Sequence, residues 1–309
     1  MRNPRVKALS ISQPVFDTAK REGLTVRVFA SYHHACNLVT SDRKIFALVS
    51  PTIGNGPLNI VIQEIGALQH VKPGVLAVFS DEQPGLGRSL VVSLEAAQLW
   101  RPEVNWKCLT AHRRRLEDNF AVLCSWLSQN GIAKGLLSLV LDIEKEPRVG
   151  EDGTGSLYNL AFLAMARVGI KGLLQALQDG ERLGIRENAT LLTGLGPGLT
   201  PAGDDYLVGL MAGLRVWPSS LNNSGLSLDD ACQIIFEATE GRTTLLSRAF
   251  LHSAKEGLLG ESWHRLLAEL ARGEAIGIQQ AAKRILASGA TSGADALAGF
   301  LSPHLWQRR

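Results

Sequence analysis

The hydrophobic pattern of this sequence changes its period from about residue 110, and that change limits the chain to a two-part fold with a join near residues 100–106. Short runs rich in β-branched and aromatic residues come first, separated by Gly, Pro and Asp, at residues 24–31, 44–50, 58–65, 74–80 and 89–94. Runs of this length and composition are typical of β-strands. Strands so closely spaced predict a small barrel or sandwich over residues 1–105.

Longer segments with apolar residues at helical spacing follow the change of period. They lie at residues 113–129, 156–178, 227–239, 243–259, 261–273 and 275–288. Apolar positions that recur every three or four residues indicate amphipathic helices, and Ser156 and Ser227 stand where N-caps are expected. We therefore predict an α+β fold in which a larger, mostly helical domain, residues 106–309, follows the β-rich domain.

The composition argues for a globular protein without a nucleic-acid surface. Apolar residues make up 45% of the 309 residues, and the net charge of +3 arises from interleaved acids and bases. The most apolar stretch, residues 157–174, is interrupted by Asn159, Arg167 and Lys171, so we expect no membrane span. The N-terminus has no long apolar run of a secretory signal. We expect a cytoplasmic protein that contacts neither nucleic acid nor membrane.

Cysteine and histidine spacing indicates no metal site. The four cysteines are widely spaced without a CxxC pair, so neither a zinc site nor a disulfide framework is expected. The seven histidines include no HxH or HExxH pattern. His33 and His34 are adjacent, and we expect them to point to opposite sides of a strand.

Residues 194–205, GLGPGLTPAGDD, are the densest signal in the chain. Four glycines, Gly194, Gly196, Gly198 and Gly203, exceed the one or two that a simple turn needs, whereas a backbone that approaches a ligand closely needs more. Thr200 and Pro201 predict the start of a helix, with Thr200 as the N-cap. A glycine-rich loop that enters a helix presents N–H groups to a phosphate or carboxylate. We predict an anion site at these glycines and Thr200, although the spacing matches neither a P-loop nor GxGxxG.

Asp204 and Asp205 fall in the first turn of this helix, and their role has several interpretations. Acids there interact favourably with the helix dipole, by about 0.3–1 kcal/mol each, so they and the glycines could be purely structural. They could instead hold Mg²⁺, accept a proton from a substrate N–H, or orient the loop by binding its N–H groups.

The motif recurs 90 positions later. Residues 201–210, PAGDDYLVGL, align with residues 291–300, TSGADALAGF, and the matched pairs are Gly203 with Gly293, Asp205 with Asp295, Leu207 with Leu297, and Gly209 with Gly299. We predict that the two helix N-termini lie close together around one ligand, which adds Ser292 and Gly293 to the anion site. Asp204 has no counterpart because Ala294 stands there, so Asp205 and Asp295 are the better candidates for a shared role.

A weaker pattern places an arginine on a polar helix face. Thr244, Arg248 and His252 are spaced four residues apart within residues 243–259. Arg248 could clamp an anion, or the three side chains could form an ordinary polar face.

At residues 194–210, GLGPGLTPAGDDYLVGL, the sequence resembles the family of the AllH-type subunit of oxamate carbamoyltransferase, formerly a bacterial family of unknown function. TTLLSRAFLHSA at 243–254 and SGADALAGFL at 292–301 are similar to that family in the same order, and GNGPLNIVI at 54–62 is a looser match. The resemblance implies a transferase of purine catabolism, in allantoin breakdown, that interconverts oxalurate plus phosphate with oxamate plus carbamoyl phosphate. It implies further carbamoyltransferase subunits as partners and small anions as substrates.

Within that reaction we expect catalytic roles for Asp205, Asp295 and Arg248, and a magnesium ion could be held by Asp204 and Asp205. Two alternatives stay open. The chain could be a non-catalytic subunit in which Gly209 and Gly213, four residues apart, let a neighbouring helix approach. It could also be a Mg²⁺-dependent hydrolase that uses the three aspartates.

Overall fold

The computed structural model describes residues 5–20, 26–63, 65–68, 71–79, 89–130, 134–141, 157–221 and 225–308. The chain divides into two compact units. The first unit comprises Met1–Glu103 and Leu258–Glu261, and the second comprises Val104–Gly257 and Ser262–Arg309.

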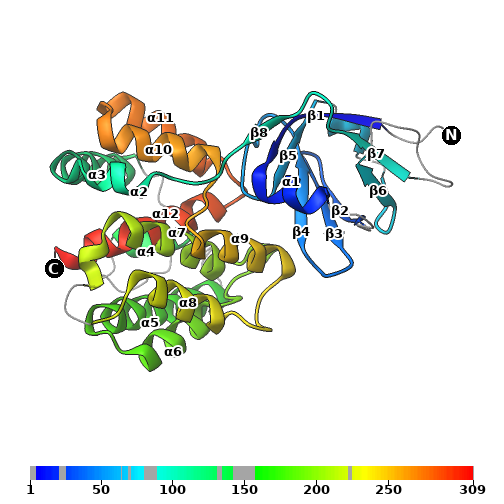
Figure 1. The fold of residues 1–309 in the computed structure, drawn as a ribbon. Helices are drawn as coiled ribbons and strands as arrows, with labels where there is room; N and C mark the ends of the chain where they lie inside the picture. Colours follow the sequence, from blue (N-terminus) through cyan, green and yellow to red (C-terminus); the bar gives the residue numbers. More distant parts are fainter. Residues whose placement is uncertain are drawn as a thin grey trace. The chain divides into compact units, whose positions relative to one another are not determined.

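A closed β-barrel forms the first unit (Figure 1). Its strands among the described residues are β1 (Arg5–Ser12), β2 (Val26–Ser31), β3 (Ala35–Thr40), β4 (Ile45–Val49), β5 (Asn59–Ile62), β6 (Leu76–Phe79) and β7 (Ser89–Ser93). They pair in the order β5-β4-β3-β2-β6-β7-β1, and pairing of β1 with β5 closes the ring. A further strand, β8 (Gln98–Trp100), pairs in parallel with the end of β1.

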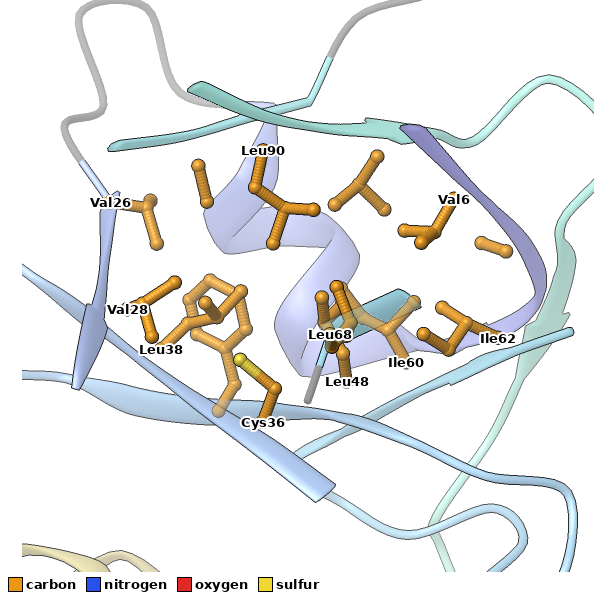
Figure 2. Packing of buried hydrophobic residues seen from close by; sticks show 14 of the residues in the cluster. Val6, Val26, Val28, Cys36, Leu38, Leu48, Ile60, Ile62, Leu68 and Leu90 are labelled. Carbon is orange, nitrogen blue, oxygen red and sulfur yellow. The ribbon is translucent and has the colours of Figure 1, made fainter. Parts of the chain in front are cut away.

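Alternating burial along the strands fills the barrel with apolar side chains. On β2, Val26 and Val28 are buried, whereas Arg27 between them is exposed. Figure 2 shows these valines facing buried residues of other strands, such as Leu38 and Ile60. The short helices α1 (Gln13–Ala19) and η1 (Ile65–Leu68) add Val15 and Leu68 to the same core.

The predicted β-rich barrel is confirmed, and each of the five predicted runs contains a strand. β1, β3, β8 and α1 were not predicted. The expectation for the adjacent histidines is wrong, because His33 and His34 lie in the bend between β2 and β3. Their rings lie edge to face there, with Nδ1 of His33 3.0 Å from Nε2 of His34.

A short segment late in the chain is part of the first unit. Asn55, in the loop between β4 and β5, accepts a hydrogen bond from Ser10 Oγ (2.6 Å) and donates through Nδ2 to Glu261 Oε2 (3.0 Å). The backbone N–H of Glu261 donates in turn to the carbonyl of Asn55 (2.9 Å). The GNGP loop therefore connects two strands and also anchors residues 258–261.

Helices form the second unit (Figure 1). Those among the described residues are α2 (Trp106–Thr110), α3 (Arg113–Gln129), α4 (Leu136–Leu141), α5 (Leu157–Asp179), α6 (Arg182–Leu192), α7 (Ala202–Val216), η2 (Pro218–Leu221), α8 (Leu228–Ala238), α9 (Leu245–Lys255), α10 (Glu261–Arg272), α11 (Ala275–Leu286) and α12 (Ser292–Gln307). The predicted mostly helical region is confirmed. Ser227 caps α8 as predicted, by accepting from the N–H of Asp230 (3.0 Å), and Ser156 lies outside the described residues.

One helix, α5, is long and apolar enough over Leu160–Asp179 to cross a membrane by length and composition alone. The core helix of a soluble protein meets the same criterion. Ile170, Leu173 and Leu177 of α5 are buried within the protein, at 0–1% exposure, and Arg167 is also buried. The residues of α5 therefore include a face that packs as core.

Candidate functional site

Two parallel helices, α7 and α12, are in unusually close contact in the middle of the helical unit (Figure 1). A Cβ atom placed on Gly209 would lie 1.8 Å from the carbonyl oxygen of Ala296, and one on Gly213 would lie 2.5 Å from that of Phe300. A step of four residues toward the C-terminus of α7, from Gly209 to Gly213, therefore matches a step of four residues toward the C-terminus of α12. The two helices run in the same direction. Their N-termini consequently lie at the same end, and Gly209 and Gly213 permit the close approach.

The contacts between these helices repeat when the two copies of the motif are exchanged. Gly209 faces the carbonyl of Ala296, and Gly299, 90 positions after Gly209, faces the carbonyl of Tyr206, 90 positions before Ala296. The aligned sequences are therefore related by an approximate two-fold axis in the structure. In a two-fold symmetric contact, if residue i of one copy touches residue j of the other, residue j of the first copy touches residue i of the second. A shift of 90 positions plays that part here.

The same relation extends to the helices that precede the pair. A Cβ on Gly203 would lie 1.9 Å from the carbonyl oxygen of Leu192, the last residue of α6, and one on Gly293 would lie 1.8 Å from that of Ile285, near the end of α11. Each copy is a helix, a loop and a helix. We call α6, residues 193–201 and α7 the first copy, and α11, residues 287–291 and α12 the second copy.

The loop of the first copy is longer than the loop of the second. In the first copy, the N–H of Gly203 donates to the carbonyl of Leu195, eight residues earlier. In the second, the N–H of Gly293 donates to that of Ser288, five residues earlier. The equivalent hydrogen bond therefore encloses three more residues in the first copy than in the second. We call residues 193–201 the long loop and residues 287–291 the short loop.

The additional length contains the glycines that the sequence singled out. Gly196 and Gly198 have φ angles of +110° and +102°, in the region that favours glycine. Within the described residues, the backbone N–H groups of Gly196, Gly198, Leu199 and Thr200 donate to no other protein group. Pro197, Gly198 and Leu199 are exposed. The long loop thus contains several backbone N–H groups without a protein acceptor, and of their residues Gly198 and Leu199 are exposed. Such donors could bind an oxyanion.

Hydroxyl groups fix the long loop on both sides. Thr244 Oγ1 donates to the carbonyl of Leu199 (2.6 Å), and Thr200 Oγ1 lies 3.0 Å from Ser292 Oγ. The predicted N-cap is wrong: Pro201 is the N-cap of α7, without a side-chain cap. Thr200 is instead hydrogen-bonded to α12, so its hydroxyl joins the two copies. This contact confirms that both N-termini lie close together. That they surround one ligand stays a prediction.

Asp204 holds the start of the long loop. It is 1% exposed, its Oδ1 accepts from the N–H of Gly194 (2.9 Å), and its Oδ2 accepts from the hydroxyl of Thr243. Burial raises the pKa of Asp204, and these donors oppose the shift. Both oxygens are engaged by the protein, which agrees with a role in orienting the loop.

Asp295 serves a different part of the helical unit. It is 0% exposed, and its Oδ1 accepts from the N–H of Leu136 (2.7 Å), the first residue of α4. Burial raises the pKa of Asp295 to about 6. Its Oδ2 has no hydrogen-bond partner among the described residues.

Asp205 is the half-buried acid of the three, beside the long loop. Burial above all, together with the charges of Asp295 and Asp204, raises the pKa of Asp205 to about 8. The hydroxyls of Ser292 and Thr200 oppose this shift. Its Oδ2 has no hydrogen-bond partner among the described residues. Asp205 therefore combines partial access, an unengaged oxygen and a pKa near neutrality.

Two family models match this chain. Residues 192–303 match the oxamate carbamoyltransferase subunit AllH, and residues 7–99 match the AllH family N-terminal domain. The chain belongs to the AllH family. No solved structure matches it.

The longer AllH match contains the long loop, all three aspartates and Arg248. Arg248 points to the end of α8, where its guanidinium donates to Thr239 Oγ1 (2.7 Å) and forms an ion pair with Glu240. It also lies 4.3 Å from the centre of the Phe236 ring. The structure thus supplies Arg248 with an acidic partner and shows no hydrogen bond from it to the long loop among the described residues.

A metal ion at this site of the AllH chain would depend on Asp205. Among the described residues, no group of three or more His, Cys, Asp or Glu side chains is placed to hold a metal ion. Asp204, the second predicted ligand, has both oxygens engaged by Gly194 and Thr243. The structure therefore assigns neither aspartate to a metal.

The sequence pattern placed Thr244 on a polar helix face but did not predict that its hydroxyl holds the long loop, and it did not single out Thr243, which holds Asp204. Thr243 and Thr244 come from the segment before α9, and Ser247 Oγ adds a longer contact of 3.4 Å to the carbonyl of Leu199. The signal that could have found them is the run TTLLS, because Thr244 is also the N-cap of α9.

Proposed function

We propose that this chain is a subunit of an oxamate carbamoyltransferase and that its long loop holds a substrate anion. Membership of the AllH family supports the reaction. The difference between the two loops supports the site, because the short loop joins the same kind of helices with three fewer residues. The extra residues therefore do not serve the connection, and the unengaged N–H groups among them suit an oxyanion.

The reaction needs such a site because both partners are anionic. A carbamoyl group moves between the nitrogen of oxamate and an oxygen of phosphate. The N–H groups of Gly196, Gly198 and Thr200 can donate to phosphate or to the carboxylate of oxamate, and the N-termini of α7 and α12 add favourable dipoles. Donors fixed in advance also stabilise charge that develops during acyl transfer.

Asp205 is the acid that we assign to proton transfer. When the oxamate nitrogen attacks the carbonyl carbon of carbamoyl phosphate, a C–N bond forms, the C–O bond to phosphate breaks, and the nitrogen loses a proton. Ionised Asp205 can accept that proton, and protonated Asp205 can return it in the opposite direction. We assign structural roles to Asp204 and Asp295, because each accepts a hydrogen bond from a backbone N–H.

The non-catalytic alternative explains a different set of residues. Close packing of α7 on α12 accounts for Gly209 and Gly213. It gives no role to the exposed part of the long loop, so we prefer the catalytic subunit. By the same resemblance we propose cytoplasmic purine catabolism and association with further carbamoyltransferase subunits.

The test is a reconstituted reaction. The chain is combined with its partner subunits, carbamoyl phosphate and oxamate, with and without Mg²⁺, and oxalurate is measured. We expect Asp205→Asn to leave assembly intact and to lower the rate by roughly 10²-fold or more, the scale of a lost proton-transfer group. An equal rate with Asp205→Asn would show that the acid is structural. Absence of oxalurate with the wild-type complex would show that this chain does not serve the family reaction.

A further inference from the structure

Two histidines form the tip of the hairpin between β2 and β3. The two strands are antiparallel, and the N–H of Tyr32 donates to the carbonyl of Ala35 (2.7 Å), which leaves His33 and His34 as the residues of the loop. Hairpin loops of two residues favour Asn, Asp and Gly. Turn formation therefore does not account for two adjacent imidazoles, and both side chains are exposed.

The hairpin tip brings two ring nitrogens together. Adjacent residues of a strand point to opposite sides, but here Nδ1 of His33 lies 3.0 Å from Nε2 of His34, with the ring centres 4.3 Å apart. Two nitrogens bound to one metal ion at about 2.0–2.1 Å are about 2.9 Å apart in a tetragonal arrangement and about 3.3 Å apart in a tetrahedral one. The observed separation falls between these two values, so both nitrogens can bind one ion with little movement.

The ring of His34 is also held from the loop after β4. Ser50 Oγ lies 3.4 Å from Nδ1 of His34, and the N–H of Ser50 donates to the carbonyl of His34 (3.0 Å). Ser50 is 3% exposed, and its hydroxyl lies 2.6 Å from Oγ1 of Thr52. A histidine that binds a metal usually donates its other N–H to a fixed acceptor, which sets the tautomer. A proton on Nδ1 of His34, donated to Ser50, leaves the lone pair of Nε2 to face His33.

We propose that His33 and His34 bind one divalent transition-metal ion of the class that prefers imidazole, such as Zn²⁺ or Ni²⁺, with water completing the coordination. The ligands are Nδ1 of His33 and Nε2 of His34. The ion replaces the hydrogen between these nitrogens, and each neutral ring keeps one proton on its other nitrogen, so no proton is released. The two residues belong to the first unit and are not part of the long loop, so the inference goes beyond the proposed function.

Calorimetric titration of the full chain, prepared without a polyhistidine tag, tests the proposal at pH 7.5. We expect Zn²⁺ and Ni²⁺ each to bind at one site per chain that includes both histidines. Excess Mg²⁺ should not compete, because it prefers oxygen ligands. Imidazole ¹⁵N spectra recorded with Zn²⁺ should show shifts of Nδ1 of His33 and of Nε2 of His34.

Variants test each ligand separately. His33→Asn and His34→Asn each remove one ligand and supply a residue that favours turns, so both should fold and bind the two ions at least tenfold more weakly than wild type. Ser50→Ala should bind about tenfold more weakly, the scale for the partner of a ligand. His112→Asn is the matched control. His112 is also exposed, with Nδ1 3.2 Å from the carbonyl of Cys108, and this variant should bind as wild type does.

The outcomes decide the site without reference to oxalurate formation. Weakened binding in His33→Asn and His34→Asn, with binding unchanged in His112→Asn, supports the proposal. It is overturned if wild type binds neither ion, or if both hairpin variants bind as wild type does. Loss of binding in His112→Asn also overturns it, because the ion would then lie near Cys108 and His112. Unchanged binding by Ser50→Ala would remove Ser50 from the site.

Discussion

The two helix–loop–helix copies of the second unit have the same framework and different loops. In both, a glycine of the second helix lies against the carbonyl of the preceding helix, as Gly203 does against Leu192 and Gly293 against Ile285. In both, a glycine one turn after the aspartate allows the helices to cross, as Gly209 and Gly299 do. The short loop shows the minimum that this framework needs, whereas the long loop has three more residues within the equivalent hydrogen bond.

The two copies lie in one chain, so residues that serve packing can be told from residues that serve function without a second protein. Features common to both copies, the glycines at the crossing above all, serve the framework, because both copies need them. Features of one copy only, such as Gly198 and the unengaged N–H groups around it, are candidates for ligand binding. Asp205 and Asp295 are equivalent by position, yet only Asp295 accepts a hydrogen bond from α4.

The largest effect is expected where the copies are alike. Gly209→Ala and Gly299→Ala would each place a Cβ within 2 Å of a backbone oxygen, at 1.8 Å and 1.9 Å. Backbone must move in either case, so we expect each to destabilise the protein by about 3 kcal/mol or more, or to prevent folding. Urea unfolding measures this. Gly66→Ala is the control, because nothing lies within 4 Å of its missing side chain. Stable variants of both glycines would refute the shared framework.

Replacement of one matched aspartate should mainly lower the reaction rate, and replacement of the other should mainly lower the stability. Asp205→Ala should lower the rate of oxalurate formation by roughly 10²-fold or more with little loss of stability. Asp295→Ala leaves the N–H of Leu136 without its buried acceptor, so it should cost about 1–3 kcal/mol of unfolding free energy and affect the rate less. Steady-state kinetics and urea unfolding of both variants give the result. Similar losses in rate and stability for both would remove the distinction between the copies.

Shortening the long loop to the length of the short one should abolish binding and spare the fold. Deletion of Pro197, Gly198 and Leu199 removes the exposed residues, while the short loop shows that fewer residues can connect such helices. The hydrogen bond from Thr244 to Leu199 is lost, which costs about 1 kcal/mol. We expect sulfate affinity to fall at least tenfold with a near-native circular dichroism spectrum. Retained affinity would place the anion elsewhere.

Much of the framework was predictable, and the roles of the acids were not. Hydrophobic period predicted α3 over 113–129 with its observed bounds, and the matched spacing predicted the adjacent N-termini. β3 was not predicted, because Cys36 and Asn37 give its sequence, ACNLVT, little strand propensity although both residues are buried. The acids differ through partners remote in sequence: Leu136 is 159 residues from Asp295, and Thr243 is 39 residues from Asp204. The additional loop residues precede the aligned segment, so alignment at a constant spacing concealed them.

The smallest expected effect is a pH dependence of stability that only the first copy shows strongly. Asp205 has a pKa of about 8 in the folded protein and about 3.9 in the unfolded chain. Between these values the folded state binds more protons, so the contribution of Asp205 to stability is complete below about pH 4 and is lost as the pH rises toward 8. The contribution of Asp295 to stability changes with pH in the same direction, over the narrower range between about pH 4 and its pKa of about 6.

Replacement of Asp205 by Asn removes this loss. The melting temperature of Asp205→Asn relative to wild type should therefore be higher at pH 8.5 than at pH 5. Asp295 is present in both proteins, so its titration cancels in the difference. The corresponding difference for Asp295→Asn should level off above about pH 7, because Asp295, with a pKa of about 6, is almost fully ionised there. If both differences rise alike up to pH 8.5, the two acids have equivalent environments, and the division of roles between the copies is wrong.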